Sequence, residues 1–304
     1  MNDVELRHVG LFASFFTERI NMGIKIVADR MIDLPDEELA ALNIDTISCY
    51  INMGNKSYSD LEDVFPEDVF RFMEETGGVA KTAAKSPALY SEFFGKFVAM
   101  GDTVIHLAVS SGISSIAQNA KTAAKDYPGK VFVIDTLLLS FGIALLAKYA
   151  LRLIAEGETD ASKIVALITE RIPSIQGSFL IDTLDCLYKG GRCSGLTYHA
   201  ANLFKIKPVI HMNDTGHMVV REKFRGGQAR ILEPYIRSTF EKRPNPDLRI
   251  LYVAYTTYNQ AVQEAILQIT AKYYDFERVE FHDVSCNCCV HSGRNTIGLF
   301  YMCK

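Results

Sequence analysis

Short apolar strands alternate with helices in the first half of this chain, and this alternation limits its possible folds more than any other feature. Strands are predicted at residues 24–28, 45–52, 103–110 and 130–134, where β-branched side chains are frequent. Helices are predicted between and after them, at residues 67–75, 90–100, 113–125, 138–156 and 161–171. Strands that alternate with helices form βαβ units, so this half predicts a mainly parallel sheet.

The pattern changes after Pro173. Strands are predicted at residues 178–181, 206–212, 217–224, 248–255, 279–284 and 296–302, and helical segments at residues 183–188, 196–203, 226–240 and 260–273. The turn signal at residues 213–216 (NDTG) joins two strands as an antiparallel hairpin, which predicts a mixed sheet. We therefore expect an α/β protein of two α/β domains. Residues 1–172 would form the first domain, with residues 1–22 as an extension, and residues 173–304 the second.

Composition excludes several classes of protein. The 304 residues carry 32 Lys+Arg against 36 Asp+Glu, a formal charge of −4, so we expect no nucleic-acid partner. The longest uncharged apolar stretch, residues 137–147, is about half of what a membrane-spanning helix needs. Residues 1–20 mix charged with apolar side chains and lack the pattern of a secretory signal. Seven cysteines, an odd number without a repeating framework, favour the reducing cytoplasm.

Two hydroxyl-rich turns are the best candidates for a binding site. Ser110-Ser111-Gly112 lies between a predicted strand and helix, where backbone N–H groups and the helix dipole favour an anion. The alternative interpretation is a helix N-cap in a tight turn. Thr82 and Ser86 could reach the same anion, although Ser86 followed by Pro87 also fits a helix start.

Three further groups carry charge or a titratable ring near predicted turns. Arg192 follows two glycines and suits a carboxylate or phosphate. Lys223 and Arg225 lie at a strand end and point the same way by the strand period of two. His291 begins a His-Ser-Gly turn. Each group also has a non-functional interpretation. The cations would then lie in solvated surface turns, and the histidine would make a structural hydrogen bond.

A metal site is considered and not predicted. Cys286, Cys288 and Cys289 with His282 and His291 suggest zinc, but no second cysteine pair with finger spacing exists. We interpret this segment as a strand that runs into a loop. No phosphate loop, G-x-S-x-G elbow or G-x-G-x-x-G fingerprint is present, so no cofactor is expected.

In their order and spacing, these groups resemble the DegV family of fatty-acid-binding proteins over residues 24–302. The matching positions are Asp29, residues 82–87, Ser110-Ser111-Gly112, Asp135-Thr136 with Ser140 and Gly142, residues 182–192, Ile206-Lys207-Pro208, residues 223–226 and His291-Ser292-Gly293.

The resemblance implies a fatty acid buried between two α/β domains, with its acyl chain in an apolar tunnel of the first. Thr82, Ser111 and the Gly112 amide would bind the carboxylate, and Arg192 and His291 would complete the polar network. Asp29 and Ser86 would belong to the same site. The resemblance also implies that the chain is a carrier, not an enzyme.

In the family, a separate ATP-dependent kinase converts the presented fatty acid into acyl phosphate for phospholipid synthesis. Arg225, with Lys223 beside it, would dock that kinase, and the carrier would contact membranes at most transiently. Two alternatives stay open. One is a serine esterase or acyltransferase with Ser111 as nucleophile, His291 as base and Asp29 or Asp135 as orienter, although its elbow motif is missing. The other is a lipid-sensing module without a kinase.

Overall fold

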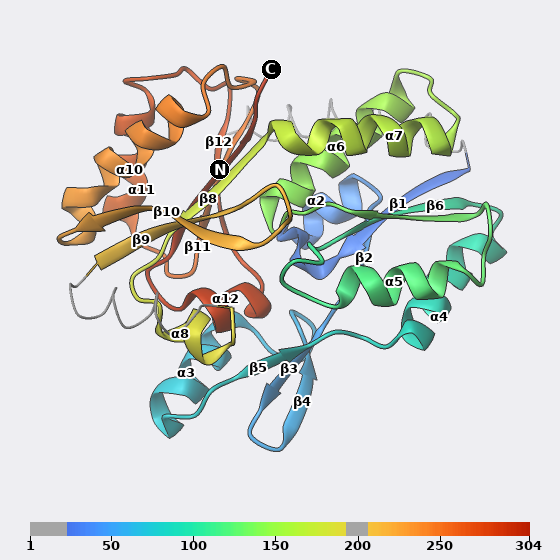
Figure 1. The fold of residues 1–304 in the computed structure, drawn as a ribbon, viewed down its shortest axis with the longest axis horizontal. Helices are drawn as coiled ribbons and strands as arrows, with labels where there is room; N and C mark the ends of the chain where they lie inside the picture. The colour runs from blue at the N-terminus through green and yellow to red at the C-terminus, as the bar shows by residue number, and fades with distance from the viewer. Residues whose placement is uncertain (1–22, 193–205) are drawn as a thin grey trace.

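The computed structural model describes residues 23–192 and 206–304, which form a mixed α/β fold around two large sheets (Figure 1). The predicted helix at residues 196–203 and Cys193 lie outside the described residues. The parallel sheet predicted for the first half and the mixed sheet predicted for the second are both confirmed. The domain boundary near residue 172 stays a prediction.

The first sheet is parallel, with the strand order β2-β1-β6-β7. Its strands are β1 (Ile24–Asp29), β2 (Asp45–Ile47), β6 (Thr103–Ala108) and β7 (Val131–Asp135). Helices α4 (Pro87–Ala99) and α5 (Ile116–Ala124) pack together on one face, and α6 (Phe141–Ala155) and α7 (Ala161–Arg171) on the other (Figure 1). A short turn of 3-10 helix, η1 (Arg30–Ile32), and helix α2 (Asp36–Ala41) follow β1. Because parallel strands end at one edge, Asp29 and Asp135 lie at the same edge of this sheet.

The second sheet is mixed, with the order β10-β9-β8-β13-β11-β12. Its strands are β8 (Ile175–Leu180), β9 (Ile206–Met212), β10 (Met218–Arg225), β11 (Leu251–Tyr255), β12 (Val279–Asp283) and β13 (Ile297–Met302). Only the pair β11–β12 is parallel among them, and β9 and β10 form the predicted hairpin. Helices α10 (Gln228–Lys242) and α11 (Gln260–Thr270) share a core with this sheet, whereas η2 (Ile172–Ser174) and α8 (Asp185–Lys189) flank β8.

Helix α6 lies between the two large sheets. It packs against β1 and β6 of the first sheet and against β8 and β13 of the second, and its Phe141 ring stacks on Tyr252 at 4.7 Å. A helix that is apolar on nearly every side needs such burial, which accounts for the long apolar stretch in the sequence. No helix among the described residues is long and apolar enough to cross a membrane. The helix begins at Phe141, later than predicted, because Leu137 and Ser140 have positive φ angles of 56° and 54°.

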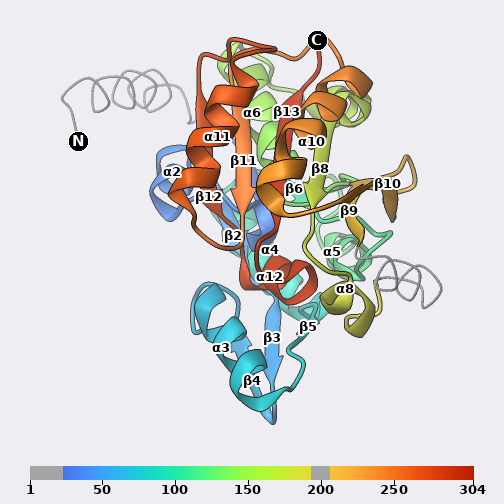
Figure 2. The ribbon, with the colours of Figure 1, turned by 90° about the vertical axis from the view of Figure 1, so that its left-hand side faces the viewer.

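A third, smaller sheet corrects the prediction of one strand over residues 45–52. The segment breaks at Ser48-Cys49, and its second part becomes β3 (Tyr50–Met53), which pairs with β4 (Lys56–Ser59) and β5 (Lys81–Ala83). The break arises because Cys49 and Ile51 join a separate small core with Val64 and Val69. With helix α3 (Pro66–Thr76), this sheet forms a lobe below α12 (Figure 2).

Helix α12 (Cys286–Ser292) corrects the prediction of a strand running into a loop. Two buried carboxylates cap its start: Asp33 accepts the Ser285 N–H at 2.9 Å, and Asp60 accepts the N–H groups of Cys286 at 2.8 Å and Asn287 at 3.0 Å. These acceptors satisfy N–H groups that a helix start leaves unpaired, and their charge favours the positive end of the helix. Since both carboxylates come from residues more than 220 positions away, local sequence could not reveal this helix.

The raised pKa of Asp33 makes the unfolding free energy of the protein depend on pH. Burial raises the pKa of Asp33 from 3.8 to about 6, so the folded state keeps a proton that the unfolded chain releases between about pH 4 and pH 6. The stability that this proton provides is lost as the pH rises through that range. We expect Asp33→Asn, which cannot titrate, to gain about 2 kcal/mol in unfolding free energy relative to the wild type between pH 4.5 and pH 7.5.

Urea unfolding of both proteins at the two pH values measures this difference. Asp275→Asn, which removes an exposed carboxylate, is the matched control for net charge. If the difference in unfolding free energy between the wild type and Asp33→Asn stays constant with pH, Asp33 is ionised in the folded protein at both pH values and the prediction is wrong.

Candidate functional site

A largely apolar, partly open cavity lies between the mixed sheet, the segments that follow strands of the parallel sheet, and β5 of the small sheet. Its apolar wall comes from strands of the mixed sheet and from segments beside the two large sheets: Met31, Ile113, Leu139, Phe179, Leu187, Met218, Ala254, Val284 and Phe300. Both halves of the chain therefore share the wall, and the tunnel of the first half for the acyl chain stays a prediction.

Thr82 and His291 form the polar pair of this cavity. Thr82 lies in β5 of the small sheet, and His291 lies in the last turn of α12. Thr82 Oγ1 and His291 Nε2 are 3.0 Å apart, although 209 residues separate them in sequence. The His291 ring packs against the Gly190 backbone, where a Cβ atom would lie 2.4 Å from Nδ1, so that position requires glycine.

His291 is neutral at physiological pH. Burial, with the charge of Arg192 as a second cause, lowers the pKa of His291 from 6.5 to about 4. A neutral imidazole that carries its proton on Nε2 donates to Thr82 Oγ1, and the Thr82 hydroxyl can then donate its own proton to another acceptor. The pair thus supplies a hydrogen-bond donor to the cavity without a positive charge.

Arg192 also lines the cavity and connects α8 to the turn after β6. Its Nε donates to the Ile113 carbonyl at 3.3 Å, and its Nη1 donates to the Gly190 carbonyl at 2.5 Å. Ser114 lies in the same turn and lines the cavity, and its hydroxyl accepts the Ile116 N–H at 3.3 Å. The sequence prediction does not include Ser114 among the residues that line the cavity. The second serine pair of this turn, Ser114-Ser115, is the one sequence signal that points to it.

Ser111 and Gly112 do not line this cavity. Ser111 is exposed, and its backbone N–H donates to Asp135 Oδ1 at 3.1 Å. The Gly112 N–H donates to Ser110 Oγ at 3.1 Å, and that hydroxyl donates to the Gly216 carbonyl at 2.7 Å. A Cβ atom on Gly112 would lie 2.3 Å from the same carbonyl. This turn therefore holds the β9–β10 hairpin against the first sheet.

Asp29 and Ser86 lie outside the cavity lining as well. The buried Asp29 carboxylate accepts the Tyr90 hydroxyl at 2.6 Å and the Val109 N–H at 2.8 Å, and it lies 3.3 Å from His106 Nε2. Asp29 therefore joins α4 to the end of the first sheet. Ser86 is the N-cap of α4, with Pro87 in its first turn, so the helix-start interpretation is confirmed.

Lys223 and Arg225 are exposed on one face of β10, as the strand period predicts. Neither residue lines the cavity. The esterase alternative finds no matching geometry, because His291 pairs with Thr82 and Ser111 is outside the cavity lining.

The cysteines of α12 hydrogen-bond to protein groups. Cys288 Sγ lies 3.5 Å from Asp33 Oδ2, and Cys286 Sγ lies 3.2 Å from the Val64 carbonyl. Burial raises the pKa of both thiols well above the ordinary value, and thiols are not metal ligands unless they lose the proton.

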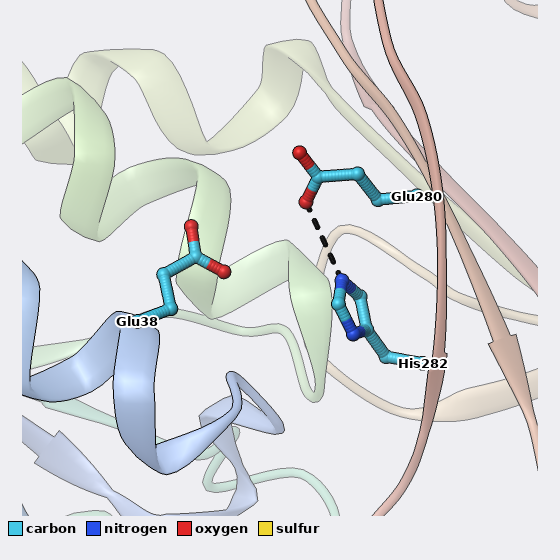
Figure 3. Close-up of side chains that lie close together, drawn as sticks. All are labelled: Glu38, Glu280 and His282. Atoms are coloured by element: carbon cyan, nitrogen blue, oxygen red, sulfur yellow. Dashed lines mark hydrogen bonds and ion pairs between the residues drawn. The ribbon is translucent and has the colours of Figure 1, made fainter. Parts of the chain in front are cut away.

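A separate polar cluster lies between α2 and β12. Among the described residues, Glu38, Glu280 and His282 are the one group whose ligand atoms, all within 4.8 Å of one another, could share a metal ion (Figure 3). His282, grouped with the cysteines in the sequence, lies 3.4 Å from Glu280 instead. Lys148 Nζ is 2.5 Å from Glu38, and Arg278 is 3.0 Å from Glu280, so two cations of the protein already balance the two carboxylates.

Comparison with known proteins agrees with this architecture. A fatty acid-binding protein of Thermotoga maritima is 28% identical over 284 residues, which cover 91% of this chain and 96% of the relative. A structure described as fatty acid binding of a DegV family protein from Thermus thermophilus superposes with a TM-score of 0.84 at 24% identity, covering 92% of this chain and 99% of the other.

A DegV family protein from Eubacterium eligens, loaded with heptadecanoic acid, has the same fold with a TM-score of 0.81 at 19% identity. The alignment covers 92% of this chain and 100% of that one. The family model described as "Uncharacterised protein, DegV family" matches residues 23–304. The chain therefore belongs to the DegV family.

Proposed function

We propose that this protein binds a long-chain fatty acid in the cavity, with the carboxylate at Thr82 and His291. The observation that carries the proposal is the neutral Thr82–His291 pair on the wall of a cavity that is otherwise mostly apolar. The relatives described as fatty-acid-binding proteins support the same ligand class.

Two energetic terms favour this ligand. Each methylene that enters the apolar part of the cavity contributes about 0.8 kcal/mol. The carboxylate must then find hydrogen-bond donors, because an unpaired buried anion is costly. Thr82 and Ser114 offer hydroxyl groups and Arg192 offers a charge at the cavity wall. Ser111 and Gly112 would contribute by fixing the turn that carries Ser114, and Asp29 and Ser86 by fixing the sheet edge and α4 beside it.

We further propose that the protein is a carrier that presents its fatty acid to a separate ATP-dependent kinase. In that step a carboxylate oxygen bonds to the terminal phosphorus of ATP, the bond from that phosphorus to ADP breaks, and acyl phosphate forms. Lys223 and Arg225, exposed on one face of β10, would contact the kinase. A lipid sensor without a kinase is the second candidate, and it would keep fatty-acid binding without any transfer.

Thr82→Val tests the carboxylate site. Valine keeps the shape of threonine and removes the hydroxyl, so we expect retention of palmitate to fall about 10- to 100-fold, as for a lost hydrogen bond to a charged group. Retention can be measured by competition with a fluorescent fatty acid. Thr169→Val, which removes an exposed hydroxyl in α7, is the matched control, and equal retention in both variants would contradict the assignment.

A charge reversal tests the docking surface. We expect Lys223→Glu together with Arg225→Glu to leave fatty-acid retention unchanged, because neither residue lines the cavity. Acyl-phosphate formation with a bacterial fatty acid kinase and ATP should fall at least about tenfold. Two cations would dock against acidic groups of the kinase, and the two new glutamates would repel those groups. Unchanged acyl-phosphate formation would remove these residues from the docking surface, and no formation by the wild type would favour the sensor.

A further inference from the structure

Ser140 places an unsatisfied hydroxyl at the cavity wall. The residue is 1% exposed and lines the cavity, and its Oγ has no hydrogen-bond partner of good geometry among the described residues. Its backbone has φ 54° and ψ −139°, a conformation that non-glycine residues rarely adopt, just before the start of α6. Strained residues of this kind tend to occur where a side chain must meet a ligand.

Three other hydroxyls that line the cavity differ from that of Ser140, because each already donates its proton to a backbone carbonyl. Thr256 donates to the Gly293 carbonyl at 2.7 Å, Thr296 to the Ser292 carbonyl at 3.0 Å, and Ser292 to the Cys288 carbonyl at 2.6 Å. These three residues line the same cavity. A plain methylene chain would suit these three residues but would give the Ser140 hydroxyl no polar partner in the cavity, and a poorly paired buried hydroxyl is costly.

The carboxylate of Asp33 determines which chemical group can pair with Ser140. Asp33 is buried behind the cavity wall, near enough to the Ser140 hydroxyl for the two to interact, and it accepts hydrogen bonds from Ser285 and Cys288. A second carboxylate beside it would be repelled, whereas a neutral hydroxyl could donate to Ser140 and accept from it. The group that complements Ser140 is therefore an uncharged oxygen with a proton.

The helix α12 relates this position to the carboxylate site. Cys288, which contacts Asp33, precedes His291 by three residues, so the two lie on one face of the helix about one turn, roughly 5 Å, apart. Ser140 lines the same cavity as the Thr82–His291 pair, on the side of Asp33, so an acyl chain held by that pair would pass along the wall that carries Ser140.

We propose that Ser140 forms a second polar subsite and that the preferred ligand is a long-chain fatty acid with a hydroxyl group close to its carboxyl end. The inference rests on the proposed fatty-acid binding and specifies its substrate class. Ser140, backed by Asp33, pairs with the ligand hydroxyl, while Thr82 and His291 hold the carboxylate.

Competition binding with palmitate, 3-hydroxypalmitate and 16-hydroxypalmitate tests this subsite. We expect the wild type to bind 3-hydroxypalmitate about tenfold more tightly than palmitate, the effect of one added buried hydrogen bond. The terminal hydroxyl of 16-hydroxypalmitate should bring no such gain. Ser140→Ala should reduce the preference to near one, while Ser162→Ala, at an exposed serine of α7, should keep it.

Ser140→Gly removes the hydroxyl and also relieves the backbone strain, so it reports on the subsite even where Ser140→Ala folds poorly. Equal binding of palmitate and 3-hydroxypalmitate by the wild type would overturn the inference, as would a preference that survives in both Ser140 variants. If the wild type binds none of the three acids, the proposed fatty-acid binding itself fails.

Discussion

Two buried carboxylates hold the start of α12, and the arrangement of the site depends on them. Asp33 follows the first strand of the parallel sheet, and Asp60 belongs to the lobe that carries the small sheet. Together they bind three successive N–H groups at the start of one short helix. Burial raises the pKa of each carboxyl, which measures the electrostatic cost of this arrangement. In return, α12 is fixed to both regions, and its last turn brings His291 to Thr82.

The cavity follows from the way the sheets meet around α6. This helix is apolar on nearly every side because one side packs on the parallel sheet and the other on the mixed sheet. The segment just before it, Leu139-Ser140, lines the cavity, as do Phe179 and Phe300 of the mixed sheet. A ligand held there would contact the mixed sheet, segments that follow the parallel sheet, and the small lobe at once, so binding would stabilise their arrangement.

The neutral state of His291 suits a carrier of anions. A protonated histidine would strengthen the grip on a carboxylate, and still more on a doubly charged acyl phosphate. Burial prevents this charge and leaves Arg192 as the one cation among the residues that line the described cavity. Because Arg192 is exposed, water screens its charge, and the proposed site would bind the acid without trapping a more highly charged product.

Sequence alone predicts those elements whose causes are local. The parallel strands, the β9–β10 hairpin, the shared face of Lys223 and Arg225 and the N-cap at Ser86 all depend on neighbouring residues, and all appear in the structure. Helix α12 and the split at Ser48-Cys49 depend on partners far away in the chain, so no local pattern reveals them. The family resemblance brought Thr82 and His291 into one site. In the structure Ser111 is exposed, and Ser114, three residues later in the same turn, lines the cavity, a difference that turn geometry decides and local sequence does not show.

The central claim is that Thr82 and His291 hold the carboxylate of a buried fatty acid. A crystal structure of the purified protein with its bound lipid tests this claim most directly. We expect a carboxylate oxygen within hydrogen-bond distance of Thr82 Oγ1, with the acyl chain in the cavity that Leu139, Phe179 and Phe300 line. A carboxylate bound elsewhere, or a chain that leaves this cavity empty, would contradict the claim.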